Sequence, residues 1–136
     1  MTLTESVSMI LSRTGALTPR FYERFFELVP EAKSFFEATN MQHQAVVLRM
    51  ALQMVEQFFT HGYEAIGEYL RVLGYKHRER GIPVELYAEW RDSLLDALEE
   101  FHGDEWNDSL ADEWTGALNQ SIDRMIEGYA LASAAI

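Results

Sequence analysis

Apolar residues recur at helical spacing along nearly the whole chain, whereas no segment alternates with the two-residue period of a half-buried strand. The pattern therefore predicts an all-α protein. Prolines, glycines and capping residues divide it into about six main helices plus a short corner helix. The predicted helices cover residues 4–13, 18–29, 30–36 (the corner), 40–61, 63–80, 83–101 and 109–131.

Helix ends are predicted from hydroxyl residues, proline and glycine. Hydroxyl side chains accept hydrogen bonds from free backbone N–H groups, so the expected caps are Thr18, Thr39 and Ser109. The last two also have the spacing of a capping box, with Gln42 and Asp112 three residues on. Pro19 suits the first turn of its helix, and Gly81 is expected to end residues 63–80 in a left-handed conformation.

Composition and charge narrow the function classes. The 136 residues are enough for one domain, expected to cover 1–136, with a core large enough to enclose a site. The net charge is -11 and no basic cluster stands out, so neither nucleic acid nor an anionic membrane is an expected partner. There is no cysteine, so any metal must be held by histidine, methionine, tyrosine or carboxylate.

The chain ends and its acidic region add two expectations. The first twelve residues lack the features of a signal peptide, and no apolar run is long enough to span a membrane, so a cytoplasmic location is expected. Eight carboxylates lie between Asp96 and Glu113, a pattern typical of a solvated face. Docking of a basic reductase there is consistent with this charge.

One histidine continues an apolar stripe. Ile66, Leu70 and Leu73 lie at i, i+4 and i+7, and His77 is the next member, which directs its side chain into the core. Taken alone, this pattern favours a buried neutral histidine that bonds a backbone carbonyl.

Two further polar residues lie among apolar ones. Gln44 is the polar member of an inward face formed by Met41, Gln44, Leu48, Leu52, Val55 and Phe59. Position alone fits a water-exposed helix end as well as a functional role. Tyr22 lies in an aromatic segment with Phe21, Phe25 and Phe26, a composition more typical of core than of a cofactor pocket. A purely structural bundle with methionine-filled packing remains an alternative, but it leaves the joint placement of Tyr22, Gln44 and His77 unexplained.

Read in order, these segments resemble a known family. Residues 21–26 read FYERFF and are followed by Pro30-Glu31-Ala32-Lys33 and then Phe36; residues 73–77 read LGYKH and are followed by Gly81 and Tyr87. This arrangement resembles bacterial haemoglobins and the globin domain of flavohaemoglobins from about Leu17 to Tyr129. The resemblance implies a globin fold that holds haem b, iron protoporphyrin IX, between the helices at 40–61 and 63–80.

The same resemblance implies roles for individual residues. His77 would be the proximal iron ligand, and Tyr22 and Gln44 would face the bound gas. The other residues implied to contact the haem or support its ligand are Phe36, Leu48, Leu73, Lys76 and Tyr87. Phe35 replaces Phe36 if the corner is shifted, and Lys76 fits an ordinary surface lysine as well as a partner of a haem propionate.

Three histidines and one departure from the family pattern need separate interpretation. His43 adjoins Gln44 and would lie over the iron if the helix were rotated, which would allow two histidine ligands; the spacing of Gln44 to Leu48 favours Gln44. His61 and His102 lie near helix ends and are expected to be solvated. Tyr129 occupies the position of the family's proximal glutamate, with Glu127 two residues earlier, so a strongly peroxidase-like iron ligand is not expected.

Hydroxyl and amide donors in a dry pocket stabilise dioxygen that carries partial negative charge. The leading hypothesis is therefore reversible binding of dioxygen or another diatomic gas, for transport or storage. The alternatives are a nitric oxide dioxygenase served by a separate reductase, and a gas-sensing or interaction module on a globin fold.

Overall fold

The structure, a computed structural model, describes residues 1–13 and 15–131, and within these ranges it contains helices and no strand. The all-α prediction is confirmed. The six α-helices are α1 (Leu3–Ser12), α2 (Thr18–Leu28), α3 (Met41–His61), α4 (Glu64–Glu79), α5 (Leu86–His102) and α6 (Asp108–Gly128). Two short 3₁₀ helices are η1 (Pro30–Phe36), the predicted corner, and η2 (Gly103–Glu105).

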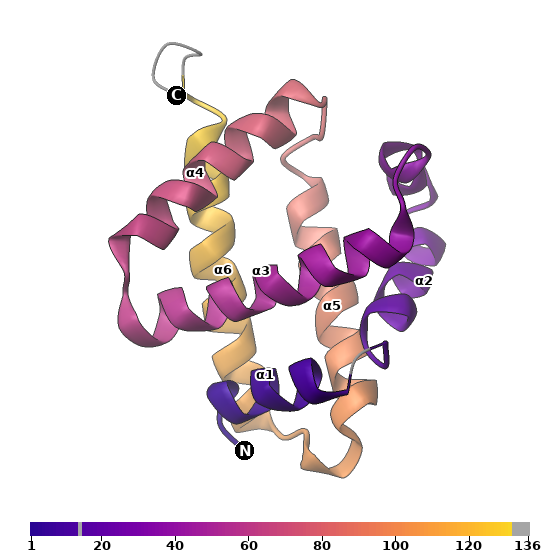
Figure 1. Cartoon of the computed structure of the whole chain (residues 1–136), viewed down its shortest axis with the longest axis vertical. Helices are drawn as coiled ribbons and strands as arrows, with labels where there is room; N and C mark the ends of the chain where they lie inside the picture. The colour runs from indigo at the N-terminus through magenta and orange to yellow at the C-terminus, as the bar shows by residue number, and fades with distance from the viewer. Residues whose placement is uncertain (14, 132–136) are drawn as a thin grey trace.

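The helices are arranged in two crossing sets (Figure 1). In this view α3 runs across α5 and α6, which lie side by side, and α1 lies below α3. Helix α4 packs most extensively against α6, and α2 packs against α5. The largest fully buried side chain is that of Trp114 on α6, which belongs to the same core cluster as Phe21 of α2 and Leu52 of α3. The core therefore joins α2, α3 and α6.

Asparagines, rather than the predicted hydroxyl residues, cap two helices. Asn40 Oδ1 accepts from the backbone N–H groups of Gln42 and His43, and Asn107 Oδ1 accepts from that of Leu110. The predicted caps Thr39 and Ser109 are therefore wrong. An asparagine amide oxygen reaches the free N–H groups as well as a hydroxyl does.

The predicted start of α2 is only partly right. Helix α2 begins at Thr18, with Pro19 in its first turn as predicted, but the cap position is Leu17 and no side chain caps it. The Thr18 side chain is buried and its hydroxyl has no hydrogen-bond partner among the described residues. Thr18 as cap was therefore wrong.

The end of α4 follows the prediction and the start of α5 does not. Gly81 follows α4 with a φ of 79°, a left-handed conformation that only glycine adopts at little cost. A turn then precedes α5, in which the carbonyls of Pro83 and Val84 accept from Leu86 and Tyr87. Helix α5 therefore begins at Leu86, three residues later than predicted.

Two glycines allow α4 and α6 to touch through their backbones. A Cβ atom on Gly74 would overlap the backbone of Met125, and one on Gly128 would overlap the backbone carbonyl of Arg71. Both glycines are buried. Because no larger residue fits at either position, the end of α6 lies directly against the helix that carries His77.

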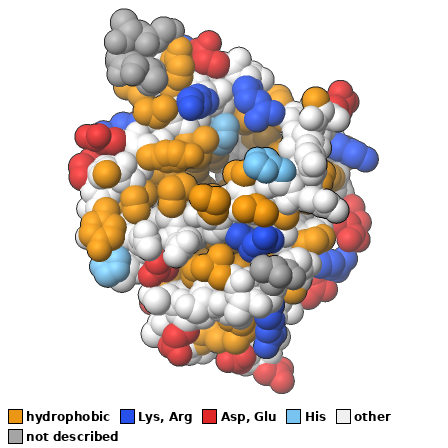
Figure 2. Space-filling model, viewed as in Figure 1, with side chains coloured by type: hydrophobic (Ala, Val, Ile, Leu, Met, Phe, Trp, Pro, Cys, Tyr) orange, Lys and Arg blue, Asp and Glu red, His pale blue; other side chains and the backbone are white. Residues whose placement is uncertain are grey.

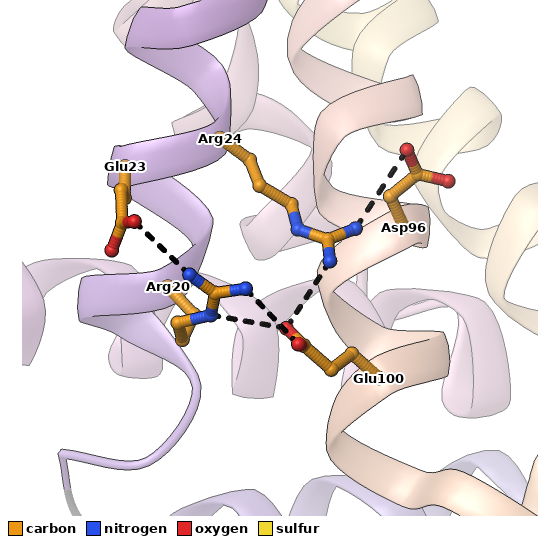
Figure 3. Close-up of polar contacts among 5 residues, drawn as sticks. All are labelled: Arg20, Glu23, Arg24, Asp96 and Glu100. Atoms are coloured by element: carbon orange, nitrogen blue, oxygen red, sulfur yellow. Dashed lines mark hydrogen bonds and ion pairs between the residues drawn. The ribbon is translucent and has the colours of Figure 1, made fainter.

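An exposed group of ion pairs joins α2 to α5 (Figure 3). Arg20 contacts Glu100 at 3.0 Å and Glu23 at 3.0 Å. Arg24 contacts Glu100 at 3.3 Å and Asp96 at 3.9 Å. Exposed pairs each stabilise a fold by about 1 kcal/mol or less, so this group orients α2 without dominating its packing. No described helix is long and apolar enough to cross a membrane.

Candidate functional site

His77 lies on the last turns of α4 and uses only one ring nitrogen within the fold. Its Nδ1 lies 2.8 Å from the hydroxyl oxygen of Tyr87 on α5, and the Nε2 atom bonds no described residue. Burial, followed by the charge of nearby Arg80, lowers the pKa of His77 from 6.5 to about 4. The imidazole is therefore neutral at pH 7 and has a lone pair available to a metal.

Two tyrosines extend the polar contacts of His77. Tyr87 is buried, and its hydroxyl oxygen lies 3.3 Å from that of Tyr129, just beyond α6. The Tyr129 hydroxyl donates to the backbone carbonyl of Ile82 at 2.8 Å. Burial, together with its bond to Tyr129, raises the pKa of Tyr87 above its ordinary value. All these groups are neutral at pH 7.

A second polar pair connects α2 and α3. The Gln44 amide Nε2 donates to the hydroxyl oxygen of Tyr22 at 3.0 Å. Tyr22 is only 6% exposed, and burial raises its pKa to about 12, so it keeps its proton at neutral pH. Tyr22 also forms part of the wall of a mostly apolar pocket of about 610 Å³ between α2 and α3. The hydroxyl hydrogen itself is left free to bond an acceptor, because Gln44 occupies the oxygen.

Aromatic rings of the corner pack beside Tyr22. The rings of Tyr22 and Phe36 meet edge to face with centroids 5.5 Å apart, and Phe36 packs on Phe26 at 5.4 Å. Arg80, which follows α4, donates to the backbone carbonyl of Phe35 at 2.7 Å. This bond ties the helix end near His77 to the corner near Tyr22. Nothing in the sequence pattern had indicated that role for Arg80.

The face that carries these elements is hollowed. Figure 2 shows an opening above α3, bordered by hydrophobic side chains and by histidines. Of the apolar residues predicted for the site, Leu48 is buried on α3 and Leu73 is partly buried on α4. Leu73 lies on the same helix as the neutral imidazole of His77, and apolar side chains near such a donor suit a flat, largely apolar ligand that carries a metal.

Comparison with known proteins decides the family. The Globin family model matches residues 19–125. This chain belongs to the globin family. The prediction made from residues 21–36 and 73–87 is therefore confirmed at the level of the family.

Relatives of this globin are longer proteins named flavohemoprotein. That of Chromobacterium violaceum is 31% identical over 129 residues, which is 91% of this chain and 31% of the relative. That of Bacillus subtilis is 29% identical over 126 residues, 90% of this chain and 31% of the relative. That of Halalkalibacterium halodurans is 27% identical over 124 residues, 90% of this chain and 30% of the relative. The globin thus spans less than a third of these relatives.

The donor set of this globin fits haem. Haem iron in globins is held by a proximal histidine through one ring nitrogen, and the other ring nitrogen bonds an acceptor. His77 has this division of roles: Nδ1 contacts Tyr87 and Nε2 bonds no described residue. No group of three or more His, Asp or Glu side chains among the described residues offers an alternative metal site.

The remaining candidates lie outside these two polar groups. His43 is exposed on α3, whereas Gln44 faces Tyr22. Lys76 is exposed, and no contact assigns it a partner among the described residues. His61 is exposed and stacks on Tyr63. Glu127 is exposed and pairs with Arg71 at 2.7 Å, away from His77.

Two predicted orientations were wrong. His102 was expected to be solvated, but it is 5% exposed and its Nε2 lies 2.6 Å from the hydroxyl oxygen of Ser6. Helix α1 covers it, which a position at a helix end does not reveal.

On α3 the buried aromatic ring is Phe58, whereas Phe59 is 41% exposed. The stripe therefore shifts by one residue near the end of this long helix.

Proposed function

We propose that this globin binds haem b with His77 as the iron ligand and reversibly binds dioxygen or another diatomic gas. The observation that carries the proposal is that two polar groups of the candidate site each have bonding capacity that no described residue uses. One is Nε2 of His77, which has a lone pair, and the other is the hydroxyl hydrogen of Tyr22. A metal suits the first, and a partly negative gas ligand suits the second.

Haem would supply the iron at which a diatomic gas binds. The side chains would hold the haem, donate a hydrogen bond to the gas and exclude water. His77 would hold the iron of the group, and Phe36 packs in the corner beside Tyr22. Tyr22 would donate its hydroxyl hydrogen to the gas, and the amide of Gln44, 3.0 Å from the Tyr22 oxygen, would orient that hydroxyl. Leu48, buried one helical turn after Gln44, helps to keep water out.

The test is to purify the protein, supply haem, and record absorption in the ferric, dithionite-reduced and oxygen-exposed states. We expect one haem per chain and a Soret band that shifts reversibly with dioxygen. A protein that remains colourless when haem is supplied would contradict the proposal. The function would then be that of an interaction module that uses the globin fold without haem.

A second candidate is nitric oxide dioxygenase activity served by a reductase. Similarity to proteins named flavohemoprotein favours it, because that name pairs a flavin with haem. Cell extract with a reduced nicotinamide should then reduce the ferric protein and sustain nitric oxide consumption above that of boiled extract. Failure of reduction with every donor tried would rule this candidate out.

A further inference from the structure

We propose that Tyr129, acting through Tyr87, is a positioning residue that fixes the tautomer of His77 and sets its strength as an iron ligand. This inference rests on the proposed function, since it concerns haem held by His77. It assigns a role to a hydroxyl that has no direct contact with the histidine.

The order of donors and acceptors fixes the direction of the chain. The carbonyl of Ile82 can only accept, so the Tyr129 hydrogen, at 2.8 Å, goes to it. The Tyr129 oxygen can then accept from the Tyr87 hydroxyl, 3.3 Å away. The Tyr87 oxygen in turn accepts from Nδ1–H of His77 at 2.8 Å. This arrangement pairs every hydrogen of the chain and leaves the lone pair on Nε2.

The opposite direction satisfies fewer groups. If Tyr87 donated to Nδ1 of His77, the single ring hydrogen of the neutral imidazole would have to lie on Nε2. The contact between the Tyr87 and Tyr129 oxygens would then contain no hydrogen, because the Tyr129 hydrogen goes to Ile82. Histidine with hydrogen on Nε2 cannot bind iron through that atom. The tyrosine pair therefore favours the tautomer that ligation requires.

Tyr129 is held on both sides by the segment that carries His77. Its backbone carbonyl accepts from Arg78 of α4 at 2.8 Å, and its hydroxyl reaches Ile82 just beyond α4. The preceding residue, Gly128, lies against the backbone of Arg71 so closely that no Cβ would fit. Tyr129 is thus placed by packing as well as by its hydrogen bonds.

The chain of acceptors behind His77 contains no carboxylate. Glu127, two residues before Tyr129, is exposed and held by Arg71 at 2.7 Å. A neutral acceptor polarises an N–H donor less than a carboxylate does, and successive hydrogen bonds reinforce one another. The imidazole should therefore give less electron density to the iron than one backed by a carboxylate.

The test uses the haem-loaded protein and two substitutions at one position. Tyr129→Glu places a carboxylate behind Tyr87, so the iron–histidine stretching band of the ferrous protein should move to higher frequency and the ferric/ferrous midpoint potential should become more negative. Tyr129→Phe removes the acceptor, so both quantities should move in the opposite direction. Tyr69→Glu and Tyr69→Phe, at an exposed position of α4, are the matched controls and should move neither.

The outcomes separate this inference from the proposed function. If the unmodified protein takes up no haem, the proposed function fails. If all variants load haem and the iron–histidine band and midpoint potential of both Tyr129 variants equal those of the unmodified protein, only the role of Tyr129 is overturned. Should Tyr129→Glu fail to fold, Tyr129→Phe alone still decides, because a purely structural tyrosine would leave the band in place.

Discussion

Tyr22 has one hydroxyl hydrogen, and under the proposed function the use of this hydrogen determines how long a gas ligand stays. The Gln44 amide donates to the Tyr22 oxygen, so the hydrogen is not needed within the fold. The pKa of the Tyr22 hydroxyl, about 12, keeps that hydrogen in place at any physiological pH. A hydrogen bond from a buried neutral donor to a charged acceptor contributes about 1.5–3 kcal/mol.

Replacing Tyr22 by phenylalanine should therefore accelerate oxygen loss by roughly 10- to 100-fold, since about 1.4 kcal/mol corresponds to a factor of ten. The ring is retained, so packing on Phe36 should survive. Stopped-flow mixing of the oxygenated protein with carbon monoxide measures this rate. Tyr69→Phe is the control, and equal rates in the two variants would show that Tyr22 does not contact the gas.

The inward direction of the His77 side chain was predictable because several signals agreed. His77 lies on an apolar stripe with Leu70 and Leu73, and its spacing to Tyr87 matches the spacing in the family that the sequence resembles. The contact between Tyr87 and Nδ1 was not predictable from spacing alone, because it depends on how α5 packs against α4. Arg80 was missed for the same reason, since its partner is a backbone carbonyl 45 residues earlier.

At the scale of elements, the contact between α4 and α6 sets how the end of α6 lies against the helix that carries His77. Gly74 lies three residues before His77, and Gly128 lies directly before Tyr129. A methyl group at either position would force the helices apart. The backbone contact therefore controls how close Tyr129, just beyond α6, lies to α4.

We expect Gly74→Ala to lower the free energy of unfolding by about 1–3 kcal/mol, as overpacked positions typically do, and to weaken haem retention. Gly116→Ala on α6 is the matched control, because a Cβ there would meet Phe59 at an ordinary 3.5 Å. That change should stabilise the helix by about 0.5–1 kcal/mol. Urea unfolding of both variants measures the difference, and equal effects would contradict a close contact at Gly74.

Most helix bounds were predictable, but the capping residues were not. Hydrophobic periodicity locates the body of α3 and α6 because one face of each is buried. Thr39 and Asn40 lie side by side, as do Asn107, Asp108 and Ser109, and any of these types can cap a helix. Which one does so depends on where the preceding chain arrives, and that is set by tertiary packing.

At the scale of the whole molecule, a buried polar group joins α1, α5 and α6. The Trp114 indole donates to the Ser6 hydroxyl oxygen at 2.9 Å, and Ser6 contacts His102 at 2.6 Å. Burial lowers the pKa of His102 below its ordinary 6.5, and nearby Arg13 lowers it further against the opposing effect of Glu105. The folded protein therefore disfavours the protonated form of this histidine.

This burial predicts a pH dependence of stability. As the pH falls through about 6.5 the unfolded chain protonates His102, whereas the folded chain, in which the pKa of His102 is lowered, takes up this proton only at a lower pH. Between these two pKa values the unfolded state binds more protons, so stability falls as the pH drops. One such group contributes a slope of at most about 1.4 kcal/mol per pH unit. Urea unfolding between pH 7.5 and 5 should show a shallower loss for His102→Gln; an identical slope would contradict the assignment.

The central claim is that His77 binds haem iron, and absorption spectroscopy of His77→Gly with and without added imidazole tests it most directly. His43→Ala is the matched control, because His43 is the other histidine considered as an iron ligand. We predict that His77→Gly loses the native Soret band, that imidazole restores it, and that His43→Ala keeps it. An unchanged spectrum in His77→Gly, or loss of the band in His43→Ala alone, would contradict the account.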